Sequence, residues 1–145
     1  MQNADVIIIG GGPAGSTCAG KLRAGGLDVL IVDKAEFPRS KLCSGWITPG
    51  VLDDLELDVE DYCRDRVFQP MSGFCIGQIG GGSVKIDYGR TVSYGILRRE
   101  FDDYLLRRSG ARLALGEAVK SIQRNANAWI VNEQYQASML VAAGG

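Results

Sequence analysis

The chain has 145 residues, 46% hydrophobic and 23% charged, which is enough apolar material to bury the core of one ordinary domain. Its formal net charge of -1 gives no basic field for nucleic acid, and it lacks an apolar run long enough to span a membrane. The four cysteines form no close pair and there is no histidine, so neither a metal site nor a redox pair is predicted.

Residues 5–9 are one acidic and four apolar residues, a pattern typical of a buried parallel strand. The stretch is short and lacks a basic leader, so we expect a core strand and not a signal peptide, in a cytoplasmic protein with reduced cysteines. A helix from Pro13 to about Gly25 and a second strand, Asp28–Val32, follow it. This order predicts a β-α-β unit.

The turn between the first strand and the helix carries the motif Gly-x-Gly-x-x-Gly, at Gly10, Gly12 and Gly15. The first glycine permits a tight turn, the second lets a pyrophosphate approach the backbone, and the third lets the helix pack on the strand. The first helical N–H groups then face the phosphates. Asp33 ends the second strand, where a carboxylate can accept hydrogen bonds from ribose hydroxyls. Strand, loop, helix and acidic residue together predict a dinucleotide site.

After Asp33 the chain departs from a plain nicotinamide-binding fold, which would soon continue into another helix and a parallel strand. Residues 34–46 are a long loop broken by proline and glycine, and long loops in compact domains are often functional. A short helix over 49–55 and an acidic, solvated stretch over 53–61 follow. The patterning then predicts a helix over 97–109 and strands near 67–77, 82–88, 91–96, 113–115, 119–124, 128–132 and 135–143.

Five motifs are spread over nearly the whole chain. They are Gly10–Gly15, Asp33–Lys34 with Phe37-Pro38-Arg39, Cys43–Gly45, Leu97–Asp102 with Leu105, and Leu140–Gly144. Together they resemble the flavin-dependent oxidoreductases of the glutathione-reductase-like FAD fold, and most of all its geranylgeranyl reductase-like branch, which is related to aromatic hydroxylases and flavin-dependent halogenases. Because the resemblance covers the N-terminal part of such an enzyme, we expect residues 1–145 to be an incomplete FAD-binding domain, with 66–96 as a β insertion toward a substrate domain.

The resemblance implies which residues hold FAD. The pyrophosphate would lie on Gly10, Gly12, Pro13, Ala14 and Gly15, the adenosine ribose beside Asp33 and Lys34, the ribityl chain and flavin along Cys43, Ser44 and Gly45, the phosphate-ribityl region opposite Arg98, and the adenine against backbone groups of Ala118 and Val119. It assigns no catalytic residue and no metal ligand. The loop reads Cys-Ser-Gly-Trp where the reductases often read Cys-Gly-x-Gly, so the substrate stays open.

The predicted fold class is therefore α/β: a Rossmann-like, three-layer FAD/NAD(P)-binding fold with a parallel sheet, a small antiparallel meander and the start of a β insertion. The implied function is FAD-dependent oxidation–reduction by hydride transfer, on an unsaturated, isoprenoid-type substrate, with NADPH or NADH as candidate electron donor. We expect a small-molecule substrate and no nucleic-acid partner, and contact with a membrane surface stays open. Two alternatives remain: a flavin-dependent monooxygenase or halogenase, and a nucleotide-binding module without turnover.

Overall fold

The computed structural model describes residues 1–145, and these form two compact units. Unit 1 comprises residues 1–40 and 102–145, and unit 2 comprises residues 41–101. Helix α4, Arg98–Arg108, contributes its first turn, residues 98–101, to unit 2 and its remainder to unit 1. None of the helices has the length and apolar character that crossing a membrane would require.

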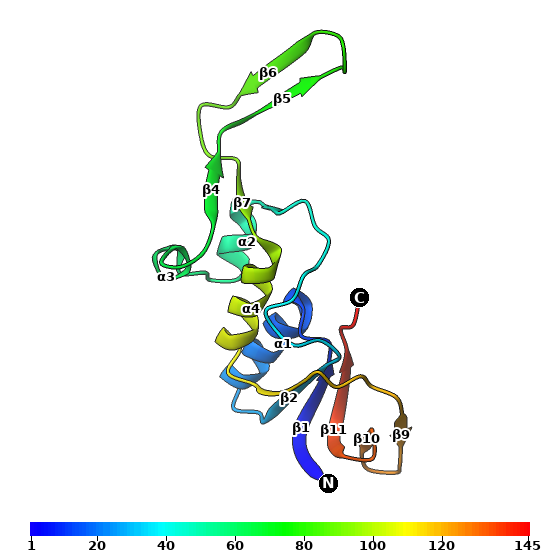
Figure 1. The fold of residues 1–145 in the computed structure, drawn as a ribbon. Coiled ribbons are helices and arrows are strands. Elements are labelled where there is room, and N and C mark those ends of the chain that lie inside the picture. The colour runs from blue at the N-terminus through cyan, green and yellow to red at the C-terminus, as the bar shows by residue number, and fades with distance from the viewer. The chain divides into compact units, whose positions relative to one another are not determined.

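A six-stranded sheet with the strand order β8-β2-β1-β11-β10-β9 forms the centre of unit 1. Its strands are β1 (Gln2–Ile9), β2 (Val29–Asp33), β8 (Arg112–Leu115), β9 (Ile122–Arg124), β10 (Trp129–Val131) and β11 (Tyr135–Ala142). The first four strands in this order pair in parallel, and β10 and β9 add an antiparallel meander. Figure 1 shows β1 and β11 side by side. The carboxyl ends of the parallel strands therefore meet at one edge, where open α/β sheets bind ligands.

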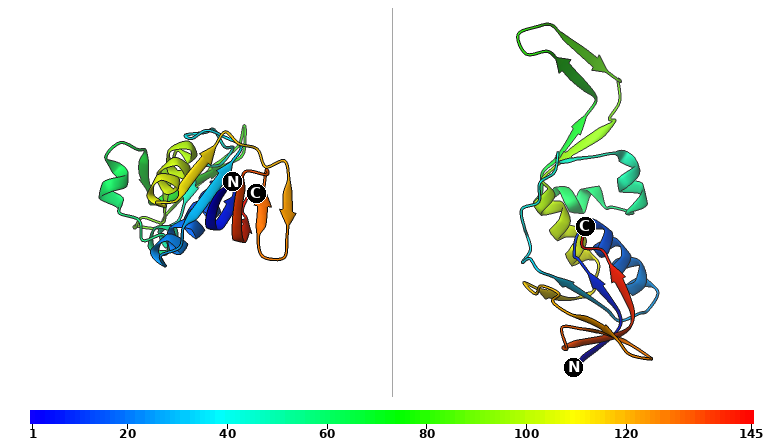
Figure 2. Two further views of the ribbon diagram at one scale, coloured as in Figure 1. Left: turned by 90° about the horizontal axis from the view of Figure 1, so that it is seen from below. Right: turned by 90° about the vertical axis from the view of Figure 1, so that its right-hand side faces the viewer.

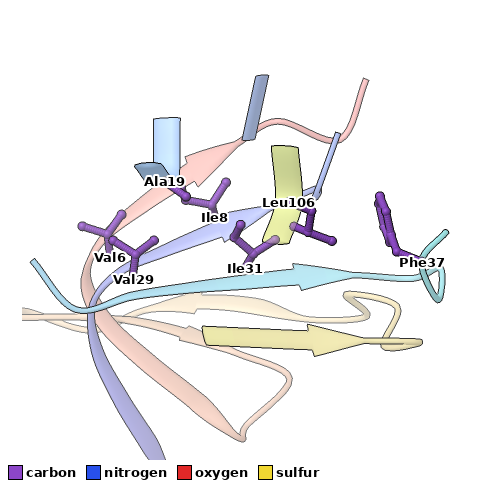
Figure 3. Close-up of a cluster of buried hydrophobic side chains, with 7 residues drawn as sticks. All are labelled: Val6, Ile8, Ala19, Val29, Ile31, Phe37 and Leu106. Carbon is purple, nitrogen blue, oxygen red and sulfur yellow. The ribbon is translucent and has the colours of Figure 1, made fainter. Parts of the chain in front are cut away.

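Apolar clusters cover both faces of this sheet. On one face, alternate residues of β1 and β2 pack against Ala19 of helix α1 (Pro13–Ala24) and Leu106 of α4. Figure 2 shows α1 on that side of the sheet, and Figure 3 shows the side chains of the cluster. On the other face, Ile7 and Leu30 cluster with Tyr135. Because successive strand residues point to opposite faces, the continuous apolar run of β1 supplies both clusters.

Unit 2 holds two antiparallel sheets and two short helices. Three strands pair in the order β3-β7-β4, and β5 and β6 form a separate hairpin. The elements are β3 (Trp46–Ile47), α2 (Pro49–Asp54), α3 (Val59–Cys63), β4 (Phe68–Met71), β5 (Gly73–Gly77), β6 (Ser83–Asp87) and β7 (Ser93–Ile96). The ring of Tyr62 is fully buried and packs edge-on against Phe68 and Phe101. Aromatic contacts of this kind stabilise the unit beyond the area they bury.

The predicted fold class, an α/β fold with a largely parallel sheet, is confirmed. Several local predictions differ from the structure, and three of the differences affect the layout of the elements. The strand predicted over 67–77 is interrupted at Ser72, so that β4 and β5 belong to different sheets. Helix α3 begins within the stretch interpreted only as acidic surface, and Asp58 caps it by accepting the N–H of Asp61 at 3.0 Å. The strand predicted over 119–124 begins only at Ile122.

The apolar clusters on the two faces of the sheet in unit 1 lead to a prediction about stability. Ile8 is fully buried between β2 and α1, so Ile8→Ala should lower the free energy of unfolding by about 2–5 kcal/mol, through lost apolar burial and the cavity left behind. Met139 on β11 is 54% exposed, so Met139→Ala should change the free energy of unfolding by about 0.5 kcal/mol or less. Chemical denaturation of the two variants compares them. Equal losses would contradict the assignment of Ile8 to the core.

Candidate functional site

Close backbone contacts require glycine at two positions, 10 and 15, in and after the loop between β1 and α1. Gly10 has φ +107°, a region that side chains rarely adopt, and a Cβ there would overlap the carbonyl oxygen of Ala143. A Cβ at Gly15 would overlap the carbonyl oxygen of Gly10. The start of α1 therefore lies directly against the end of β1, and Gly10 lies against the residue that follows β11. Gly12 is different, since a Cβ there would meet only a guanidinium nitrogen of Arg39, at 3.6 Å.

The N-terminus of α1 offers unpaired hydrogen-bond donors. Its N-cap is Gly12, which has no side chain to cap the helix, and its first turn contains no acidic residue. The N–H groups of Ala14 and Gly15 make no hydrogen bond within the protein. Such donors, at the positive end of the helix dipole, favour an anion. This part of the loop fits a phosphate group.

Asp33 braces this loop in addition to its predicted role. One carboxylate oxygen accepts the N–H of Gly11 at 2.7 Å, and the other accepts the N–H of Ala35 at 2.8 Å. Each oxygen retains a further lone pair that can accept a ribose hydroxyl. Lys34, predicted beside it, is exposed at the end of β2.

Arg39 lies beside the loop, a position that the motif Phe37-Pro38-Arg39 alone did not predict. Its Nη1 lies 3.2 Å from Oδ2 of Asp102, a carboxylate with no exposed surface on α4. Its guanidinium also stacks over the ring of Phe37, with Cζ 4.7 Å from the ring centroid. The second guanidinium nitrogen faces Gly12. A guanidinium held in this way is a suitable partner for a phosphate oxygen.

Ala118 and Val119 lie in a segment that returns from the carboxyl edge of the sheet. The N–H of Gly116 donates to Ala35 at 3.3 Å, and the N–H of Glu117 donates to the carbonyl of Asp33 at 2.9 Å. Ala118 and Val119, the predicted adenine contacts, therefore come directly after a residue that is hydrogen-bonded to Asp33, the predicted ribose contact. Within unit 1, the structure brings the glycine loop, Asp33 and this segment to the same edge of the sheet.

Unit 2 brings together Cys43, Gly45 and Arg98. The N–H of Gly45 donates to the Cys43 sulfur at 3.4 Å, and this bond, followed by a hydrogen bond from Arg98, lowers the pKa of the Cys43 thiol. Gly45 has φ +69°, and a Cβ there would lie 2.6 Å from the carbonyl oxygen of Ile96. Ser44 between them is exposed. No group of three or more metal-ligating side chains occurs in the chain.

Comparison with known proteins identifies the family of the chain. The model of the family described as FAD dependent oxidoreductase matches residues 5–105, more than half of the chain. The chain belongs to this family.

Individual relatives agree with the assignment to the FAD dependent oxidoreductases. A menaquinone reductase from Mycobacterium tuberculosis is 34% identical over 142 residues, which are 90% of this chain and 33% of that protein. Digeranylgeranylglycerophospholipid reductase 1 from Methanothermobacter thermautotrophicus is 26% identical over 160 residues, covering all of this chain and 40% of that protein. The chain therefore spans about a third of the length of the first of these relatives and 40% of the second.

The fold is shared with a solved structure described as a geranylgeranyl bacteriochlorophyll reductase-like protein from Thermoplasma acidophilum. The TM-score is 0.80, with 23% sequence identity over 100% of this chain and 40% of that one. At this identity the likeness concerns the fold. It supports the expectation of an α/β fold with a mostly parallel sheet and small antiparallel sheets.

The ion pair of Arg39 gives a prediction for this family member. Asp102→Asn removes the charge opposite a largely buried guanidinium, so it should lower the free energy of unfolding by about 3 kcal/mol. Asp103→Asn, the neighbouring substitution, affects only an exposed pair with Arg107 and should cost about 0.5 kcal/mol. Thermal or urea unfolding measures both. Equal and small losses would show that Asp102 does not hold Arg39.

The environment of Cys43 predicts a pH dependence. Because its pKa is lowered, a larger fraction of Cys43 is thiolate at a given pH than for an ordinary cysteine. Cys43 should therefore be alkylated by iodoacetamide at lower pH. Arg98→Gln removes one of the lowering interactions and should move the midpoint of the alkylation profile upward. Mass spectrometry of the Cys43 peptide follows the rate against pH. A profile that Arg98→Gln leaves in place would contradict the Arg98–Cys43 interaction.

Proposed function

We propose that the protein binds FAD and acts as an FAD-dependent oxidoreductase. The observation that carries this proposal is the start of α1, where the N–H groups of Ala14 and Gly15 have no partner and follow the N-cap Gly12. The guanidinium of Arg39 faces the same glycine. Backbone donors and an arginine together match the two phosphates of a dinucleotide. Membership of the FAD dependent oxidoreductase family favours FAD among the dinucleotides.

The remaining predicted contacts complete the proposed cofactor site. We assign Asp33, with Lys34, to the adenosine ribose and Ala118 and Val119 to the adenine. The residues Cys43, Ser44, Gly45 and Arg98 of unit 2 are the proposed contacts of the ribityl and flavin part. When bound, FAD supplies hydride-transfer chemistry. The protein side chains and peptide groups hold and orient it.

For the substrate, we propose an unsaturated compound of the isoprenoid type, with NADPH or NADH as the electron donor. Support comes from the names of the relatives, one a menaquinone reductase and the other a digeranylgeranylglycerophospholipid reductase. A substrate of this kind implies contact with a membrane surface by a protein that we place in the cytoplasm. The 66–96 region, which contains β4 to β7, is proposed as the start of the substrate domain.

The experiment is to purify the full-length protein and to compare it with two glycine variants. The wild type should carry the visible absorption of a flavin, identified as FAD after denaturation. Gly12→Ala should keep the thermal stability but weaken FAD binding about tenfold or more, because the added methyl group stands where a phosphate approaches. Gly20→Ala, on the same helix, meets only the Cα of Ser109 at 3.8 Å and should bind FAD normally.

A colourless full-length protein that takes up no added FAD would overturn the proposal. Anaerobic oxidation of the reduced protein by a prenylated quinone or a geranylgeranyl lipid tests the substrate class. Oxidation by O₂ alone, with a hydroxylated or halogenated product, would instead indicate the monooxygenase or halogenase alternative.

A further inference from the structure

The side chain of Asn132 organises the segment that carries Val119. Its Oδ1 accepts the N–H of Lys120 at 2.7 Å and that of Ser121 at 3.3 Å. Its Nδ2 donates to the carbonyl of Ala118 at 2.9 Å. One amide side chain therefore bonds to backbone groups on both sides of Val119. These backbone groups precede β9, which begins at Ile122, the residue opposite the end of β10.

These bonds determine the direction of the Val119 peptide groups. The Ala118 carbonyl and the Lys120 N–H both point toward Asn132. In a planar trans peptide the carbonyl and the N–H point in opposite directions, so the N–H and the carbonyl of Val119 both point away from Asn132. Neither makes a hydrogen bond within the protein. The open cavity on this segment is lined by residues on either side of Val119 and not by Val119 itself.

Val119 is also anchored on its other side. Its side chain packs against the apolar cluster that contains Ile7 and Leu30. Glu117, two residues earlier, accepts a hydrogen bond from the hydroxyl of Tyr135 at 2.8 Å. Burial, followed by the hydrogen bond to Glu117, raises the pKa of Tyr135, so the hydroxyl remains a donor. The segment is thus held at both ends while one donor and one acceptor of Val119 stay unpaired.

We propose that Asn132 is a positioning residue, which holds the N–H and the carbonyl of Val119 toward an adenine base. Adenine presents an amino donor next to a ring-nitrogen acceptor, and this pair matches the acceptor and the donor of one extended residue. The inference rests on the proposed function, since it assigns the adenosine end of FAD to this peptide edge. It adds a residue, Asn132, that lies in a turn and makes no contact with the base.

A simpler role for Asn132 is to form the turn between β10 and β11. Asn132 and Glu133 have φ values of +52° and +57°, and the N–H of Gln134 donates to the carbonyl of Val131 at 3.1 Å. Asparagine and glycine are both favoured in such turns. Asn132→Gly therefore preserves the turn and removes only the side-chain amide. It separates the two roles.

The test measures the dissociation constants of FAD and FMN for the full-length apoprotein, because FMN lacks the adenosine part. Asn132→Gly should raise the dissociation constant of FAD about tenfold and that of FMN less than about twofold, through loss of the oriented hydrogen bonds to adenine. Asn132→Asp keeps the acceptor for Lys120 but not the donor for Ala118, and should lie between. The matched control is Glu133→Gly, in the same turn, whose exposed side chain makes no hydrogen bond to the segment.

The ratio of the two dissociation constants decides the inference. A selective loss of FAD affinity in Asn132→Gly, with Glu133→Gly unchanged, supports it. An equal loss for both flavins, or an unchanged affinity for FAD, overturns it and leaves the proposed function in place. If Asn132→Gly does not fold, the same ratio for Asn132→Asp decides. Wild-type protein that binds neither flavin would overturn the proposed function itself.

Discussion

The close approach of α1 to the end of β1 is the constraint on which the rest of the site depends. The carbonyl oxygen of Gly10 occupies the place that a Cβ of residue 15 would need, and the carbonyl of Ala143 closes on Gly10 in the same way. Because the helix begins against the end of β1, its unpaired N–H groups open at the carboxyl edge of the sheet. A cradle for phosphate thus follows from backbone packing before any charged side chain is considered.

Polar side chains in unit 1 act mainly on this backbone and on one another. Asp33 accepts the N–H groups of Gly11 in the loop and of Ala35 beyond β2, so it holds the loop in addition to the ribose contact predicted for it. Asp102 has no exposed surface and holds Arg39 next to Gly12. An isolated buried carboxylate would be costly, and its pairing with Arg39 offsets that cost. Asp102, which would not touch a ligand itself, therefore decides where the guanidinium of Arg39 lies.

In the segment that follows β8, a polar side chain also positions backbone groups. Asn132 bonds to the backbone on both sides of Val119 and leaves the peptide groups of that residue without a partner. In unit 2, Gly45 brings its N–H to the sulfur of Cys43, where Arg98 also bonds. In each case a left-handed residue lets the chain turn sharply enough to make these bonds, and it is an asparagine or a glycine.

Features set by neighbouring residues could be predicted from the sequence, whereas contacts between residues far apart in the chain could not. Residue spacing was sufficient for the glycine loop and for α4, because periodicity and turn chemistry are properties of neighbouring residues. Helix α3 is also set by neighbouring residues, but it was not predicted, because its acidic residues were interpreted as solvated surface. The sequence by itself determined the β-α-β unit with its glycine loop, and it predicted a dinucleotide site there. Only the tertiary structure decided that Asp102 holds Arg39 and that Asn132 holds the Val119 segment, since partners far apart in the chain leave no local pattern.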